Sequence, residues 1–194
     1  MTVPGMVPPV ADERQALLTY LAQQRYVLRL TAYGLTDEQA RRASPVGTLT
    51  VGGLIKHVAE TEWSWIDIVL QRDAKPSPED YPDTFRLGPA ETLDGVLRRY
   101  EEVAARTEAV VAGIDDLGRA VPVPHDVPWF PPHLEAWSVR WVLLHLVEET
   151  ARHAGHADIV RESVDGATAF PLMAAAEGWA PTAWIQPWRP PGET

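Results

Sequence analysis

The stretch HLVEETARHAGH, residues 145–156, decides how this chain folds and what it could bind. At about 100° per residue, an α-helix places His145, Glu149, His153 and His156 within an arc of about 80°. The positions between them are mostly apolar or small, which is typical of a helix that borders a protein interior. A buried carboxylate beside imidazoles is costly unless a cation compensates it. The pattern therefore predicts a long interior helix that carries metal-competent side chains.

The rest of the chain predicts three further long helices around this one. The 145–156 helix is expected to begin near Trp137, or alternatively at Ser138, and to end at Gly166. The other apolar periodicities and capping residues predict helices over about 12–33, 50–72 and 90–113, with a short helix starting at Thr36. Proline-rich connections over 75–89 and 118–135 are interpreted as loops, and no strand is expected. The predicted fold class is all-α, a four-helix bundle with long crossover loops.

Composition limits the classes of partner. The 194 residues suit a single domain, with a helical core over about 12–166 and a tail over 167–194 that packs on it. The net charge of −10 disfavours nucleic acid and anionic membranes as partners. No apolar run approaches membrane-spanning length, and residues 1–15 lack the pattern of a signal peptide, so a cytoplasmic protein is expected. Because the chain has no cysteine, any thiol in its chemistry must arrive as a substrate.

Helix geometry limits how the polar residues could share one ion. His145 and His153 are about 12 Å apart along the helix axis, whereas a ligand bond is only about 2 Å long. Only one i,i+4 pair can therefore bind a given ion, either His145 with Glu149 or Glu149 with His153. A further ligand must come from another helix, and His57 in LTVGGLIKHVAETEW (49–63) lies on a face that is predicted to point into the core. Such cross-helix sets are how helical bundles build interior metal sites.

The segment 49–63 and the segment around 145–156 resemble the corresponding segments of the DinB-like superfamily. The resemblance covers residues 12–166 and is most specific in EETARHAGHADIVRE (148–162). The similarity is to an uncharacterised actinobacterial branch and to the N-terminal domain of mycothiol-dependent maleylpyruvate isomerase. The resemblance implies a divalent ion held by His57, Glu149 and His153. The isomerase has a further C-terminal domain that these residues do not include, so maleylpyruvate is not the expected substrate.

The resemblance also implies a function. We expect a metal-dependent enzyme that transfers a low-molecular-weight thiol such as mycothiol to a small electrophile, with zinc as the first choice of metal and nickel as the second. His145 and His156 are expected to orient ligands or transfer protons. The alternatives are a thiol-independent hydrolase, isomerase or cyclase using metal-activated water, and a non-catalytic metal- or small-molecule-binding protein. Arg140 and Arg152 could meet substrate carboxylates, although surface ion pairs are the simpler interpretation.

Eight tryptophans are many for a chain of this length. Trp63, Trp65 and Trp141 could line an apolar substrate pocket, or they could pack in the core or at a dimer interface. The tail, rich in tryptophan and proline, could close the pocket or contact a second copy of the chain through Trp179, Trp184 and Trp188. A homodimer is therefore a further expectation.

Overall fold

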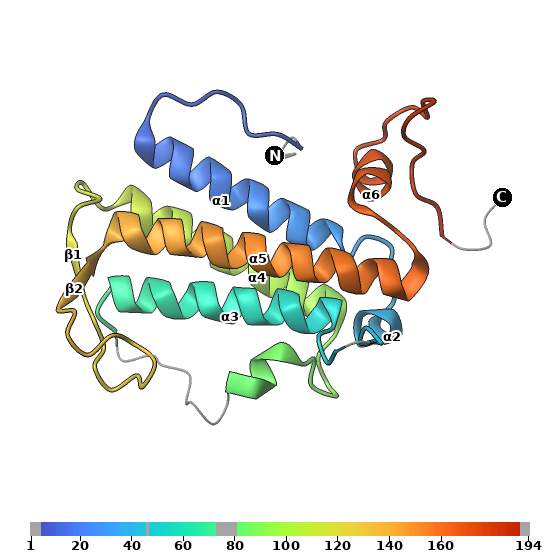
Figure 1. Cartoon of the computed structure of the whole chain (residues 1–194). Helices are drawn as coiled ribbons and strands as arrows, with labels where there is room; N and C mark the ends of the chain where they lie inside the picture. Colours follow the sequence, from blue (N-terminus) through green and yellow to red (C-terminus); the bar gives the residue numbers. More distant parts are fainter. Residues whose placement is uncertain (1–4, 46, 73–80, 191–194) are drawn as a thin grey trace.

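The computed structural model describes residues 5–45, 47–72 and 81–190, and within them the chain is mostly helical (Figure 1). The elements are α1 (Glu13–Leu30), α2 (Asp37–Ala40), α3 (Val51–Val69), the 3-10 helix η1 (Tyr81–Phe85), α4 (Leu93–Ala112), β1 (Ala120–Pro122), β2 (Ala136–Ser138), α5 (Val139–Asp165) and α6 (Ala169–Ala176). None of the helices in these residues is long and apolar enough to cross a membrane.

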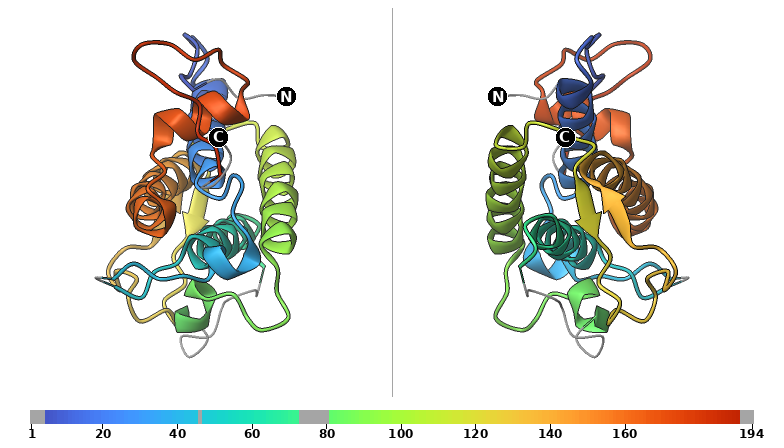
Figure 2. Two further views of the ribbon diagram at one scale, coloured as in Figure 1. Left: turned by 90° about the vertical axis from the view of Figure 1, so that its right-hand side faces the viewer. Right: turned by 90° about the vertical axis from the view of Figure 1, so that its left-hand side faces the viewer.

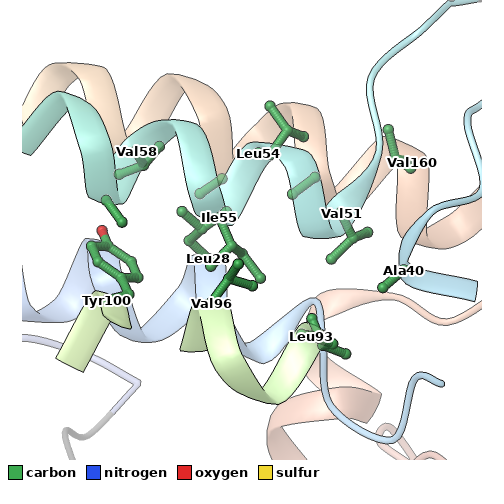
Figure 3. Close-up of a cluster of buried hydrophobic side chains, with 14 of the residues drawn as sticks. Leu28, Ala40, Val51, Leu54, Ile55, Val58, Leu93, Val96, Tyr100 and Val160 are labelled. Carbon is green, nitrogen blue, oxygen red and sulfur yellow. The ribbon is translucent and has the colours of Figure 1, made fainter. Parts of the chain in front are cut away.

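The four long helices α1, α3, α4 and α5 form a bundle (Figure 2). Helix α5 packs against both α1 and α3, and α3 also packs against α4, so α3 and α5 form the centre of the molecule. One core cluster joins Leu28 of α1, Leu54 of α3, Tyr100 of α4 and Val160 of α5 (Figure 3). A second cluster, around Trp65 and Leu143, fills the end of the bundle near β1 and β2.

Side-chain caps explain where the long helices begin. Asp12, Thr50, Thr92 and Ser138 each accept a hydrogen bond from the backbone N–H three residues later, which satisfies a donor that the helix itself leaves free. The caps predicted at Asp12 and Thr50 are thereby confirmed, and Ser138, the alternative to Trp137, is the N-cap of α5. Gly166 ends α5 with a φ of 77°, as its sequence predicted.

The expectation that the chain has no strand is wrong for two short segments. β1 and β2 pair antiparallel, with Val121 opposite Trp137, inside the α4–α5 connection that was interpreted partly as loop. Three residues are too few to show an alternating pattern in the sequence. The pairing holds the start of α5, together with Trp137, beside α3.

Two glycines allow the α3–α4 connection to lie directly on α3. A Cβ atom at Gly53 would be 1.9 Å from the carbonyl oxygen of Phe85, and one at Gly52 would be 2.5 Å from Leu87 Cδ1. At Gly53 only a residue without a side chain permits this approach, because the clash would be with backbone. Part of the predicted 75–89 loop lies outside the described residues, but 81–85 forms η1, which is held against α3.

A buried ion pair links α1 to α3. Arg25 Nε and Nη2 donate to the two carboxylate oxygens of Glu62 at 3.1 and 2.6 Å, and the side chains are 5% and 1% exposed. Thr107 of α4 donates to the same carboxylate at 2.5 Å. The Glu62 carboxylate therefore joins three of the four long helices through hydrogen bonds in the core.

The described part of the tail packs against the C-terminal end of α1, near Leu30. Trp188 contacts the cluster of Leu30, Leu172 and Met173, and its ring lies 4.9 Å from the guanidinium carbon of Arg161. The guanidinium of Arg161 is fully buried and donates to the carbonyls of Thr31 and Tyr33, so it satisfies acceptors at the end of α1.

Candidate metal centre

His57 of α3 and the pair Glu149 and His153 of α5 bring three potential ligand atoms together between the helices. The three atoms all lie within 4.8 Å of one another. Glu149 Oε1 is 3.3 Å from His57 Nε2 and 3.1 Å from His153 Nε2. Two ligands of one tetrahedral ion with bonds of about 2.0 Å are separated by about 3.3 Å. The spacing of these side chains therefore suits a single divalent cation.

The hydrogen bond of His57 Nδ1 shows that Nε2 is the ring nitrogen that is free to bind a cation. Thr84 of η1 donates its only hydroxyl proton to the carbonyl of Tyr81 at 2.7 Å. The same oxygen lies 2.9 Å from His57 Nδ1, so it accepts a hydrogen bond from Nδ1–H. In a neutral imidazole this arrangement leaves a lone pair on Nε2, directed at Glu149. The Phe85 ring stacks on the imidazole at 3.7 Å between ring centroids and fixes its plane.

The electrostatics of this contact favour a cation between the groups. His57 is only 1% exposed, and burial lowers the pKa of its imidazole, which disfavours the charged form. Contact with the imidazole of His153 first, and with that of His57 second, lowers the pKa of Glu149, so its carboxylate is ionised. A neutral Nε2 lone pair and a carboxylate oxygen at 3.3 Å repel each other unless something positive lies between them. The donor set therefore fits a divalent ion.

His156 contacts the other side of His153 rather than the ligand atoms. The Nδ1 atoms of the two imidazoles are 3.4 Å apart, one turn along α5. If His153 Nε2 binds a cation, its Nδ1 carries the proton and can donate it to His156 Nδ1. This contact would orient His153, and His156 does not line the cavity described below.

A cavity of about 440 Å³ begins at the ligand atoms and extends between α3 and α5 toward the strands. His57 and Glu149 line one end. Six aromatic side chains line it: Trp65, Tyr81, Trp129, Phe130, Trp137 and Trp141. Such a mostly apolar hollow with a few convergent polar groups is typical of a small-molecule site.

One wall of this cavity is a row of rings that begins in β2 and continues along α5. Trp141 stacks on Trp137 at 4.9 Å and on His145 at 5.2 Å between ring centroids, with interplanar angles of 11° and 12°. Glu149 follows one turn later. His145 Nδ1 lies 3.3 Å from Glu148 Oε2, so its other ring nitrogen is available to the cavity. The polar residues of α5 therefore have two different surroundings. Glu149 and His153 lie close to His57, whereas His145 faces the cavity.

Several other expectations can now be compared with the structure. Trp65 and Trp141 line the cavity, whereas Trp63 packs against the guanidinium groups of Arg99 and Arg106 on α4. None of the described tail residues lines the cavity, so the expectation that Trp179, Trp184 and Trp188 close it is wrong. Arg140 pairs with Glu13 at 2.7 Å, and neither Arg140 nor Arg152 lines the cavity.

The sequence did not reveal the residues that support His57 and close the cavity. Thr84 and Phe85 lie in a connection interpreted as loop, and so do Val127, Trp129 and Phe130. The one signal in the sequence is the pair Gly52-Gly53 inside a helix, because an interior glycine pair often marks the close approach of another segment.

Replacing Thr84 with valine is expected to weaken divalent-metal binding about 10- to 100-fold, because it removes the hydrogen-bond acceptor that orients His57. Competition against a chromophoric chelator measures the affinity. Thr84→Ser is the matched control, since serine keeps the hydroxyl and should keep affinity within about threefold of the parent. Equal weakening by both substitutions would show that the packing of η1, and not this hydrogen bond, supports the site.

Comparison with known proteins agrees with this architecture. Residues 16–166 match the model of a protein family described as mycothiol-S-transferase (MST). A crystal structure of a conserved protein from Enterococcus faecalis has a TM-score of 0.63 and 16% identity, covering 81% of this chain and 100% of that one. At that identity the likeness shows the fold alone, and it confirms the predicted helical bundle. No curated protein matches the chain significantly.

Proposed function

Because the chain belongs to the mycothiol-S-transferase family, we propose that it is a divalent-metal-dependent enzyme that transfers mycothiol to a small electrophile. The observation that carries this proposal is the set of three acceptor atoms from His57, Glu149 and His153 at the inner end of an aromatic cavity. A site with three protein ligands leaves a position for substrate, as catalytic metal sites require.

In this proposal His57, Glu149 and His153 hold the ion, with zinc as the first choice and nickel as the second. The chemistry that such an ion supplies is a lower pKa for the substrate thiol, from about 8.5 to a value that leaves thiolate at neutral pH. Thr84 and His156 keep the two imidazoles oriented through their Nδ1 atoms. The chain has no cysteine that could compete with the substrate for this position.

The cavity residues have separate roles in the transfer. The aromatic walls hold the electrophile and exclude water from the reacting atoms. Because His145 Nδ1 lies against Glu148, its other ring nitrogen, Nε2, accepts the proton that the thiol loses. The sulfur then forms a bond to the electrophilic carbon, and the leaving group departs with its electron pair.

Conjugation of mycothiol to monochlorobimane by the zinc-loaded protein tests this function. We expect fluorescent conjugate at a rate at least about 100-fold above the rate without enzyme, lost on chelation and restored by zinc. Bacillithiol and glutathione serve as comparison thiols. Absence of conjugation with every cellular thiol would reject the transferase. Turnover of a substrate without any thiol would instead favour a metal-dependent hydrolase, isomerase or cyclase.

A further inference from the structure

We infer that the electrophile is a flat aromatic molecule that is neutral or positively charged and carries no carboxylate, phosphate or sulfonate. This inference rests on the proposed function and adds to it the chemical class of the second substrate. It depends on the shape and the charge of the cavity beyond the ligand atoms.

The walls of the cavity select for flat rings. Trp65 lies 5.4 Å from Phe130 and 5.1 Å from Trp137, measured between ring centroids, so rings from α3, the 123–135 connection and β2 form one continuous surface. Tyr81 and Trp129 approach to 5.8 Å and extend this surface to η1. Aromatic rings favour offset-stacked or edge-to-face contacts at such distances. A flat aromatic ligand can make these contacts with several walls at once.

The described lining residues include no lysine or arginine, and their fixed charges are the carboxylates of Glu60 and Glu149. Two cations on the same helices have other partners: Lys56 pairs with Glu91 at 2.8 Å, and Arg140 pairs with Glu13 at 2.7 Å. An anionic group placed in the cavity would therefore lose its hydration without gaining an ion pair from any of the described lining residues.

The ion at the inner end would not attract an anionic electrophile once the thiol is bound. The formal charges of a divalent cation, the Glu149 carboxylate and one thiolate sum to zero. Among the described lining residues, Glu60 then carries the remaining fixed charge, and its side chain has no hydrogen-bond or ion-pair partner within the described part of the chain. Electron-rich ring faces next to a carboxylate favour cations. A dianion such as maleylpyruvate is accordingly disfavoured.

Binding of unreactive analogues tests the inference without catalysis. We would titrate the full-length, metal-free protein by calorimetry with acetanilide, its 4-trimethylammonio derivative and 4-acetamidobenzoate, so that Glu60 and Glu149 set the charge of the cavity. The cationic analogue is expected to bind at least about threefold tighter than the neutral one, and the anionic analogue at least about tenfold weaker. Binding of the anion as tightly as the neutral compound, or no binding by any of the three at millimolar concentration, would overturn the inference.

Two pairs of variants test whether Glu60 causes the charge preference and whether Trp129 contacts the bound ring. Glu60→Gln should remove the preference for the cation, while Glu102→Gln on the exposed face of α4 should not. Trp129→Ala should weaken the neutral and cationic analogues at least about threefold, while Trp184→Ala, at a side chain that is 94% exposed in the tail, should change neither. Persistence of the cation preference in Glu60→Gln would contradict the assigned role of this carboxylate.

Chloroacetanilide counterparts of the three analogues separate this inference from the proposed function. Transfer of mycothiol forms a sulfur–carbon bond and breaks the carbon–chlorine bond, chloride leaves with the electron pair, and the thiol proton goes to His145. If the analogues bind with the expected order but no thiol is transferred, the proposed function fails, while the ligand class inferred for the cavity stands. If the anionic counterpart reacts as fast as the neutral one, the function stands and the inference fails.

Discussion

Replacing His57 with alanine is expected to weaken zinc binding more than about 100-fold, so that protein purified after zinc loading and desalting retains almost no metal. Loss of an orienting neighbour already costs about 10- to 100-fold in such sites, and loss of a ligand should cost more. Mycothiol conjugation should fall with the metal content. Elemental analysis of untagged protein, with chelator competition for the affinity, measures the effect.

The control for this substitution is another histidine of the same chain. His133 is exposed in the 123–135 connection and does not line the cavity, so His133→Ala should retain the metal content and affinity of the parent protein. Unchanged zinc content in His57→Ala would remove the premise shared by the metal site and the transferase. The thermal unfolding curve of metal-free His57→Ala should remain cooperative, which separates ligand loss from unfolding.

The largest expected loss of stability comes from Glu62→Gln, which keeps the side-chain volume but removes the negative charge beside Arg25. The guanidinium would remain buried without its partner on α3, and breaking such a pair costs about 3–5 kcal/mol in the free energy of unfolding. For a chain of this size the melting temperature should fall by about 6–20 °C. Thermal denaturation followed by circular dichroism, with urea titration for the free energy, measures both quantities.

Glu102→Gln is the matched control for stability as well. Glu102 lies 3.7 Å from Arg99 on the surface of α4 and its side chain is 69% exposed, so the free energy of unfolding should change by less than about 0.5 kcal/mol. A loss below about 1 kcal/mol for Glu62→Gln would mean that Glu108, which also contacts Arg25, or water replaces the lost charge.

The bundle could be predicted from local features of the sequence. Apolar periodicity gave the four long helices, and Asp12, Thr50 and Gly166 marked ends that the structure confirms. The boundaries near residue 90 and residue 137 were less accurate, because Thr92 and Ser138 compete with neighbouring residues that can also begin a helix. The strands were missed because their pairing joins residues 14 or more positions apart and each is only three residues long.

The site was only partly predictable because its parts lie far apart in the sequence. Spacing restricted the α5 ligands to two i,i+4 pairs, and the resemblance to the DinB-like superfamily, not geometry, favoured Glu149 with His153. The structure brings these residues to His57, although metal binding itself remains a prediction. Thr84, Phe85 and the ring-lined connection over 127–131 could not be predicted, because no local pattern shows which loop will fold over which helix.

Anomalous diffraction from crystals of the zinc-loaded protein, measured on both sides of the zinc absorption edge, tests the central claim most directly. We predict one strong peak per chain at about 2.0–2.2 Å from His57 Nε2, His153 Nε2 and a carboxylate oxygen of Glu149. A peak bound only by other residues, or crystals of the loaded protein with no peak between α3 and α5, would contradict it.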